Sequence, residues 1–132
     1  MEAFQLDRFI KAQDAYNTYG QVLRELRDGM KRSHWIWFIF PQQKGLGKSY
    51  YSEYYGLDGI EEAKAYLAHP VLGHRLRECC QELQKHEGKS IRNIMGSGID
   101  VLKLKTSMIL FDKISPNEVF AKVLEKFYSN NK

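Results

Sequence analysis

The sequence has few of the residues that cross-link or interrupt a chain. Among 132 residues there are two cysteines, Cys79 and Cys80, and three prolines. Adjacent cysteines rarely form a disulfide with each other, so a small secreted domain held together by disulfides is not expected. The chain also has no internal repeat, low-complexity stretch or linker, and its length fits one domain over residues 1–132.

A long apolar run and a targeting sequence are also missing. The longest apolar stretch, Trp35–Pro41, is far shorter than the roughly 20 residues that a membrane-spanning helix needs. The first eight residues lack the basic start and apolar core of a signal peptide. We therefore expect a cytoplasmic protein without a membrane partner.

The charge balance is only mildly basic. The formal net charge is +4, charged residues make up 27% and hydrophobic residues 43% of the chain. This apolar content supplies a core and argues against disorder of the whole chain. The positive charge permits an acidic partner, such as nucleic acid or a phosphorylated small molecule, but does not require one.

Recognisable motifs for metal, nucleotide or nucleophile chemistry are absent as well. Gly45–Ser49 ends like a phosphate-binding P-loop, but Gln42 stands where that motif needs its first glycine. His69 and His74 are five residues apart and lack a carboxylate at ligand spacing, so neither a metal nor another cofactor is expected. A looser anion site at the glycine-containing loop stays open, because backbone amides there can meet phosphate.

What the chain does contain is apolar residues at helical spacing. Leu72, Leu76, Cys79 and Leu83, for example, form one stripe at spacings of four, three and four. Comparable patterns predict helices over residues 6–16, 20–30, 49–55, 60–68, 70–86 and 100–114, a turn over 90–95, and a last helix that opens with Ser115–Glu118 and ends at Phe127.

The apolar run that begins at Trp35 is hydrophobic on every face, which permits a buried strand or a buried helix. Almost no other segment could pair with a strand, so a short buried helix is favoured, capped by Ser33 and ended by Pro41. The prediction is an all-α domain of six to eight mostly short helices packed at mixed angles.

Several polar side chains fall where the pattern places the core. Gln13 lies within the apolar stripe of the first helix, either as a core amide bonded to the protein or as a ligand contact. Asp100, Lys103 and Ser107 share a strip on a helix that is apolar nearly all round. Two interpretations are open for this strip: Asp100 is an N-cap with a local ion pair, or Lys103 holds an anion that Ser107 orients.

A third polar group precedes the apolar run. Arg32 and His34 are placed directly before it, and a histidine at such an edge can exchange a proton near neutral pH. Trp35 and Trp37 can stack a planar ring. The alternative is a hydrogen-bonded histidine and two core tryptophans.

Long blocks of the chain resemble the DUF1810 family. The blocks are Phe9–Gln13, Lys31–Gln42, Gly45–Gly47 with Ser49, Glu62–Ala63 with Ala65–Leu67, His69–Gly73 with Arg75–Leu76, and Asp100 with Lys103, Ser107–Met108 and Leu110–Phe111. Thr106 and Ile109 depart from the family, whose members often have serine and threonine there. The resemblance implies a compact, entirely helical fold, also described as Rv1873-like, and no established activity. Some members carry an inherited calpastatin label, but an inhibitor of that type is long, disordered and repetitive, unlike this short chain.

The family blocks coincide with the polar residues above, which suggests that they converge in one site. We predict a small-ligand pocket for an anionic or nucleotide-derived ligand, and the pattern leaves both binding and catalysis open. Its ligand-binding residues would be Gln13, Arg32, Trp37, Gln42, Ser49, Lys103 and Ser107, and its candidates for proton transfer would be His34 and Asp100.

Two rival hypotheses remain. In the first, the chain is an RNA- or protein-binding module without catalysis, which a surface cluster of Lys44, Lys48, Arg75 and Arg77 would indicate. In the second, the polar residues only stabilise the fold. The sequence does not determine the oligomeric state.

Overall fold

The computed structural model describes residues 4–129; residues 1–3 and 130–132, which the predicted domain limits include, lie outside this range. The predicted all-α class is confirmed, because no strand occurs in the described range and its single β-bridge joins Gln43 to Leu57. The helices are α1 (Asp7–Asp14), the 3-10 turn η1 (Ala15–Asn17), α2 (Thr18–Asp28), α3 (Ile36–Ile39), α4 (Tyr50–Tyr54), α5 (Gly59–Ala68), α6 (Leu72–Gln84), α7 (Ile91–Met95), α8 (Gly98–Ile114) and α9 (Val119–Tyr128).

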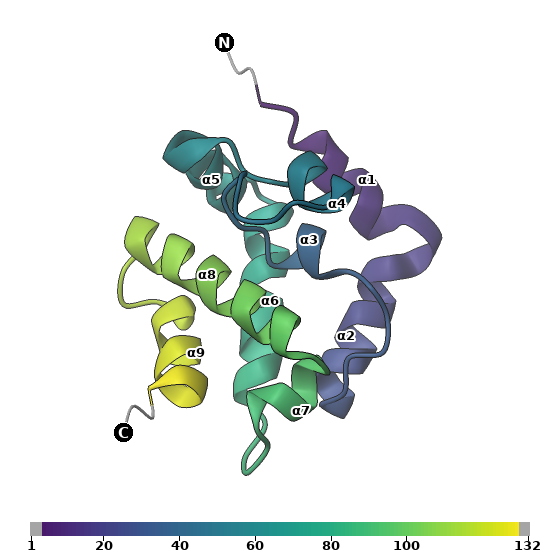
Figure 1. Cartoon of the computed structure of the whole chain (residues 1–132), viewed down its shortest axis with the longest axis vertical. Helices are drawn as coiled ribbons and strands as arrows, with labels where there is room; N and C mark the ends of the chain where they lie inside the picture. Colours follow the sequence, from purple (N-terminus) through teal and green to yellow (C-terminus); the bar gives the residue numbers. More distant parts are fainter. Residues whose placement is uncertain (1–3, 130–132) are drawn as a thin grey trace.

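Helix α6 is packed among several other helices. Its apolar stripe from Leu72 to Leu83 is at most 1% exposed, as the spacing predicted. Helices α2, α5 and α9 all pack against α6, and Figure 1 shows α8 crossing in front of it. Helix α3 packs against α8, and α4 lies above α3 in the same view. No helix in residues 4–129 is both long and apolar enough to cross a bilayer.

The first two helices meet at a sharp break rather than at the predicted helix end. Helix α1 stops at Asp14, and Tyr16 and Asn17 adopt left-handed backbone angles with φ of 53° and 57°. This conformation costs a residue other than glycine about 1–2 kcal/mol, although asparagine tolerates it best. The break reverses the chain, so that α1 and α2 pack against each other.

Two predicted helix starts are wrong, and one predicted turn is a helix. The side chain that caps α8 is Ser97, whose oxygen accepts from the backbone N–H of Asp100 at 3.1 Å. Asp100 therefore lies in the first turn and is not the cap. Helix α9 begins at Val119, so Pro116 precedes it instead of opening it. The predicted turn over 90–95 closes into the short helix α7.

Ser33 does not cap α3, because its hydroxyl donates a hydrogen bond to a buried carboxylate. Glu25 on α2 is 0% exposed and accepts hydrogen bonds from the backbone N–H groups of Arg32 and Ser33 at 2.8 and 3.1 Å. It also accepts from Trp35 Nε1 at 2.9 Å, from Gln21 Nε2 at 2.8 Å and from the Ser33 hydroxyl. These bonds attach the segment before α3 to α2 and fix where α3 begins.

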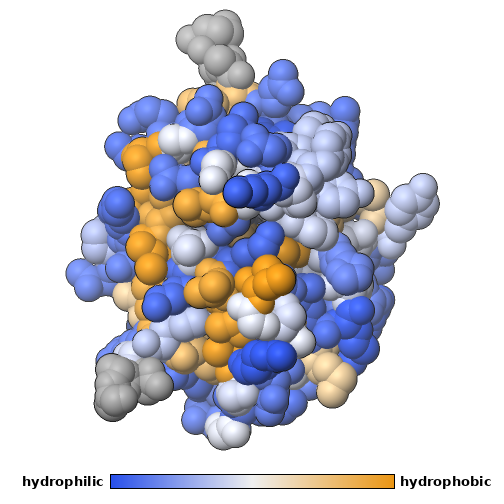
Figure 2. Space-filling view, in the orientation of Figure 1, coloured by the Kyte–Doolittle hydropathy of each residue, from blue (hydrophilic) through white to orange (hydrophobic). Residues whose placement is uncertain are grey.

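The exposed side of α8 also differs from expectation. The apolar pattern predicted a helix buried nearly all round, but Ile99, Leu102 and Ile109 are 68%, 63% and 45% exposed. Figure 2 shows hydrophobic side chains gathered on the face over which α8 runs. Only the opposite side of α8, which carries Leu104, Met108 and Phe111, enters the core.

Candidate functional site

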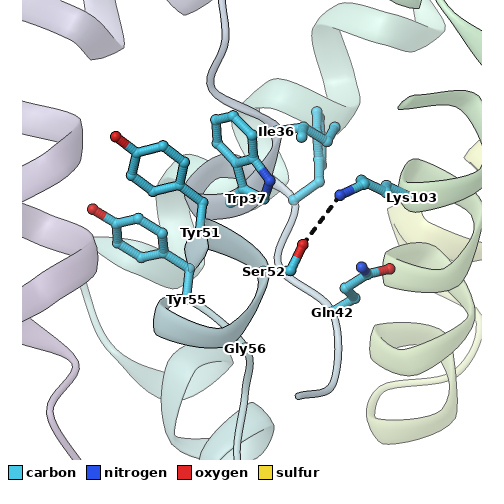
Figure 3. Close-up of a pocket in the computed structure, with 9 residues that line it drawn as sticks. Ile36, Trp37, Gln42, Tyr51, Ser52, Tyr55, Gly56 and Lys103 are labelled. Carbon is cyan, nitrogen blue, oxygen red and sulfur yellow. Dashed lines mark hydrogen bonds between the residues drawn. The ribbon is translucent and has the colours of Figure 1, made fainter. Parts of the chain in front are cut away.

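A narrow cavity lies between α3, α4, α8 and the loop that follows α3 (Figure 3). Ile36, Phe40 and Gly56 form the apolar part of its lining, and Trp37, Tyr51 and Tyr55 form its aromatic wall. Its polar lining consists of Gln42, Ser52 and Lys103. The cavity volume is about 10 Å³, which is room for about one water molecule.

Backbone hydrogen bonds hold the loop in place beside the cavity. The backbone N–H of Leu57 donates to Gln42 O at 2.9 Å, and the N–H of Lys44 donates to Leu57 O at 2.8 Å. Gly47 must be glycine, because a Cβ there would lie 2.4 Å from Ser52 Oγ. The glycine-containing loop therefore serves to pack tightly against α4, and it places Gln42 and Ser52 opposite α8.

Hydrogen-bond donors converge on this cavity. Lys103 Nζ donates to Ser52 Oγ at 3.3 Å, and within residues 4–129 no carboxylate forms an ion pair with it. Trp37 Nε1 is buried and has no partner in the same range. Gln42 uses its oxygen to accept from the Thr106 hydroxyl, and Figure 3 shows its amide nitrogen on the side of Ser52.

The electrostatics of the cavity follow from this donor set. An ammonium group, an indole N–H and an amide N–H can only donate, and no carboxylate lines the cavity. Burial, with smaller contributions from Tyr54, Tyr51 and Tyr50, raises the pKa of Tyr55, so its phenol stays protonated at neutral pH. The cavity therefore suits an acceptor atom, above all a negatively charged oxygen.

A wider hollow opens on one side of the cavity. It has a volume of about 560 Å³ and is lined by Ala12, His34 and Phe38 together with Trp37, Tyr51 and Tyr55. We call this the aromatic hollow. The last three residues also line the cavity, so they form a shared wall. The ring centroids of Trp37 and Tyr51 are 4.8 Å apart, which closes the wall between the two spaces.

A second hollow lies on the α8 side. Leu46, Ile99 and Leu102 give it an apolar surface, and it shares Gln42 and Lys103 with the cavity. These three side chains are 58%, 68% and 63% exposed.

Four of the predicted site residues lie at or beside the cavity. Trp37, Gln42 and Lys103 line it, and His34 lines the adjacent aromatic hollow. The sequence analysis missed Ser52 and the tyrosines Tyr51 and Tyr55. Their signal was present as four tyrosines within Tyr50–Tyr55, directly after the glycine-containing loop.

Three predicted ligand-binding residues, Gln13, Arg32 and Ser49, do not line the cavity. Gln13 is 1% exposed, and its amide donates to Phe38 O at 2.8 Å and to Tyr66 Oη at 3.3 Å while it accepts from Arg75 Nη1 at 3.1 Å. Its amide thus links α1 to three other parts of the core. Arg32 is exposed and pairs with a carboxylate of α2, and Ser49 caps α4.

Asp100 and Ser107 are not part of the cavity lining either. Asp100 Oδ2 lies 2.9 Å from Lys31 Nζ, and the two side chains are 16% and 5% exposed. Asp100 therefore forms its ion pair with Lys31, in place of the local pair that one of the two interpretations of the sequence allowed. Ser107 is 0% exposed, and its hydroxyl has no partner among residues 4–129.

Metal-ligating side chains and cysteine thiols are two further kinds of group that can carry chemistry. Within residues 4–129, no set of three or more histidine, cysteine, aspartate or glutamate side chains is arranged to hold a metal ion. Cys79 and Cys80 are fully buried thiols, and burial raises the pKa of Cys79 to about 12. Such thiols are poor nucleophiles.

Comparisons with known proteins agree with the family resemblance. Residues 3–132 match the model of the family described as "Protein of unknown function (DUF1810)". The fold is similar to the crystal structure of the conserved hypothetical protein Rv1873 from Mycobacterium tuberculosis, with 45% sequence identity and a TM-score of 0.91 over 97% of this chain and 90% of that one. No curated protein matches the chain. The chain therefore belongs to the DUF1810 family.

Proposed function

We propose that this protein, in the cytoplasm, binds a small anionic ligand whose charged oxygen enters the cavity between α3, α4 and α8. The observation that carries the proposal is the set of donors around that space. Lys103 has no carboxylate partner in the described range, and Trp37 Nε1 is buried without an acceptor. A buried donor without a partner costs about 1–3 kcal/mol, and an anionic oxygen would remove that cost.

Each lining residue would have a definite task in binding. Lys103 would neutralise the charge, while Trp37 Nε1 and the Gln42 amide would direct hydrogen bonds to the oxygen. Ser52 already accepts from Lys103 at 3.3 Å and would donate its own proton to the ligand. Gly47 and Gly56 supply no side chain, which keeps the loop close to Ser52 of α4.

The small volume restricts how the ligand is held. About 10 Å³ admits one oxygen-sized atom, so the remainder of the ligand must lie outside, in a neighbouring hollow. Entry of a whole phosphate or carboxylate group requires the half-exposed side chain of Tyr51 to move away from Trp37.

Binding, rather than catalysis, is the function that this geometry supports. A proton-transfer pair would need His34 and Asp100 near one reacting atom. His34 faces the aromatic hollow, whereas Asp100 is engaged with Lys31 beneath the segment before α3. A catalytic role for His34 alone stays a prediction.

The RNA-binding alternative receives less support. Of the four cations expected to cluster, Arg75 is paired with Asp14 at 2.9 Å and Arg77 with Glu118 at 2.8 Å. Two of the four cations are therefore already neutralised by carboxylates of the protein.

Isothermal titration calorimetry with inorganic phosphate, followed by inorganic pyrophosphate, tests the proposal. We expect measurable binding by the unmodified protein and a loss of about 10- to 100-fold in affinity for Lys103→Ala, the effect of one charge-assisted hydrogen bond. Lys113→Ala is the matched control, because Lys113 is an exposed lysine of the same helix. Equal affinities for both variants, or no binding of either anion by the folded protein, would contradict the proposal.

A further inference from the structure

The aromatic hollow has the size and surface of a site for a planar ring. Its volume of about 560 Å³ lies within the range of about 300–1,000 Å³ that is common for small-molecule sites. Tyr51 is 49% exposed, and Trp37 and Phe38 are partly exposed, so part of each ring is accessible to a ligand. No lysine, arginine, aspartate or glutamate lines the hollow.

The rings form a continuous surface instead of isolated contacts. Trp37 lies 4.8 Å from Tyr51, and Phe38 lies 5.4 Å from Tyr55, measured between ring centroids. Tyr51 and Tyr55 are nearly parallel, with an interplanar angle of 19° and a centroid distance of 6.3 Å. Aromatic surfaces of this kind stack planar bases without needing a particular base.

One polar side chain lies at the edge of this surface. His34 is exposed and lines the hollow, and within residues 4–129 its ring has no hydrogen bond or ion pair with the protein. An imidazole offers both a donor and an acceptor nitrogen. His34 can therefore meet the nitrogen and oxygen atoms at the edge of a stacked heterocycle.

The hollow and the donor cavity are adjacent, because Trp37, Tyr51 and Tyr55 line both. A ligand that uses both spaces must combine a flat ring with an anionic group across a short linker. A nucleoside monophosphate has this form, since one sugar joins its base to its phosphate. A sugar phosphate would fill the cavity but leave the aromatic surface uncovered.

We propose that the ligand is a nucleoside monophosphate, with its base in the aromatic hollow and its phosphate at Lys103, Trp37 Nε1 and Gln42. This inference rests on the proposed anion site and specifies its ligand class. Tyr51 separates from Trp37 to admit the phosphate and then covers the base, while His34 contacts the base edge.

Calorimetric titrations with AMP, UMP, ribose 5-phosphate and adenosine test the inference. We expect at least one of the two nucleotides to bind about tenfold more tightly than ribose 5-phosphate, the ratio that moderate base stacking produces. Tyr51→Ala should remove this preference, so that the ratio of nucleotide affinity to ribose 5-phosphate affinity falls to about one. Tyr51→Phe keeps the ring and should retain the preference, and Tyr50→Ala is the control from the same helix, since Tyr50 is 71% exposed and outside the hollow.

The outcomes separate the two proposals. If ribose 5-phosphate binds as tightly as both nucleotides, and Lys103→Ala still weakens its binding, the nucleotide inference is overturned and the anion site is retained. If Tyr51→Ala weakens the binding of AMP, UMP and ribose 5-phosphate equally, the nucleotide inference is likewise overturned and the anion site is retained. If adenosine and AMP bind with equal affinity, and Lys103→Ala changes neither affinity, the anion site is overturned and the nucleotide inference with it.

Discussion

Glu25 should contribute stability that disappears in acid. Burial alone would raise the pKa of this carboxyl, but hydrogen bonds from Ser33, Gln21, the Arg32 backbone and Trp35 outweigh burial and lower the pKa to about 2 from the ordinary 4.5. A lowered pKa stabilises the folded state fully above the unfolded value, and the contribution is lost as pH falls from about 5 to about 2. The difference of about 2.5 pKa units corresponds to about 3 kcal/mol.

Glu25→Gln is the direct test of this contribution. The amide keeps the shape of the side chain but turns one acceptor into a donor, which faces the N–H groups of Arg32, Ser33 and Trp35. We expect a decrease of about 3 kcal/mol in the free energy of unfolding at pH 7, or about 10 °C in melting temperature for a chain of this size. Urea titrations at several pH values between 2 and 7 measure it.

The pH dependence decides whether the reasoning holds. The difference between the original protein and Glu25→Gln should shrink as the pH approaches 2, because the carboxyl of Glu25 becomes increasingly protonated. Glu61→Gln is the control, since Glu61 is 79% exposed and its ion pair with Lys64 is 3.9 Å long. A Glu25→Gln variant as stable as the Glu61→Gln variant at pH 7, or a difference that is constant with pH, would refute the role of Glu25.

Two further substitutions separate stability from binding. Asp100→Ala should lower the free energy of unfolding by about 3 kcal/mol, because it leaves Lys31, whose side chain is 5% exposed, without its carboxylate partner, and should not change phosphate affinity in calorimetry. Gly47→Ala should weaken phosphate binding and cost about 1–3 kcal/mol in urea denaturation, because the added Cβ would lie 2.4 Å from Ser52 Oγ.

Each of these has an outcome that contradicts it. If a folded Asp100→Ala protein no longer binds phosphate, Asp100 contributes to the binding site and the prediction is wrong. Gly98→Ala is the control for Gly47→Ala, since a Cβ at Gly98 meets no atom within 4 Å. Equal stability and phosphate affinity in these two alanine variants would show that the loop does not position Ser52.

The fold class followed from the sequence because helix formation is largely local. The spacing of Leu72, Leu76 and Leu83 records which side of α6 faces inward, and all three are at most 1% exposed. The short apolar helix α3 was predicted correctly for a related reason, since no other segment could pair with it as a strand. Chemical character also identified Trp37, Gln42 and Lys103, which lie together at the cavity.

The partners of the polar residues were decided by tertiary structure. Helical spacing placed Asp100 beside Lys103, but packing brings Lys31 within 2.9 Å of Asp100 and leaves Lys103 to face Ser52. Glu25 was overlooked, although it lies three residues after the buried Val22 on the same helix. The sequence by itself determined where helices form and which sides are apolar, because backbone hydrogen bonds within a helix set that periodicity. Contacts between segments distant in sequence depend on how the helices pack, so only the tertiary structure decided which polar groups are satisfied and which remain free to bind.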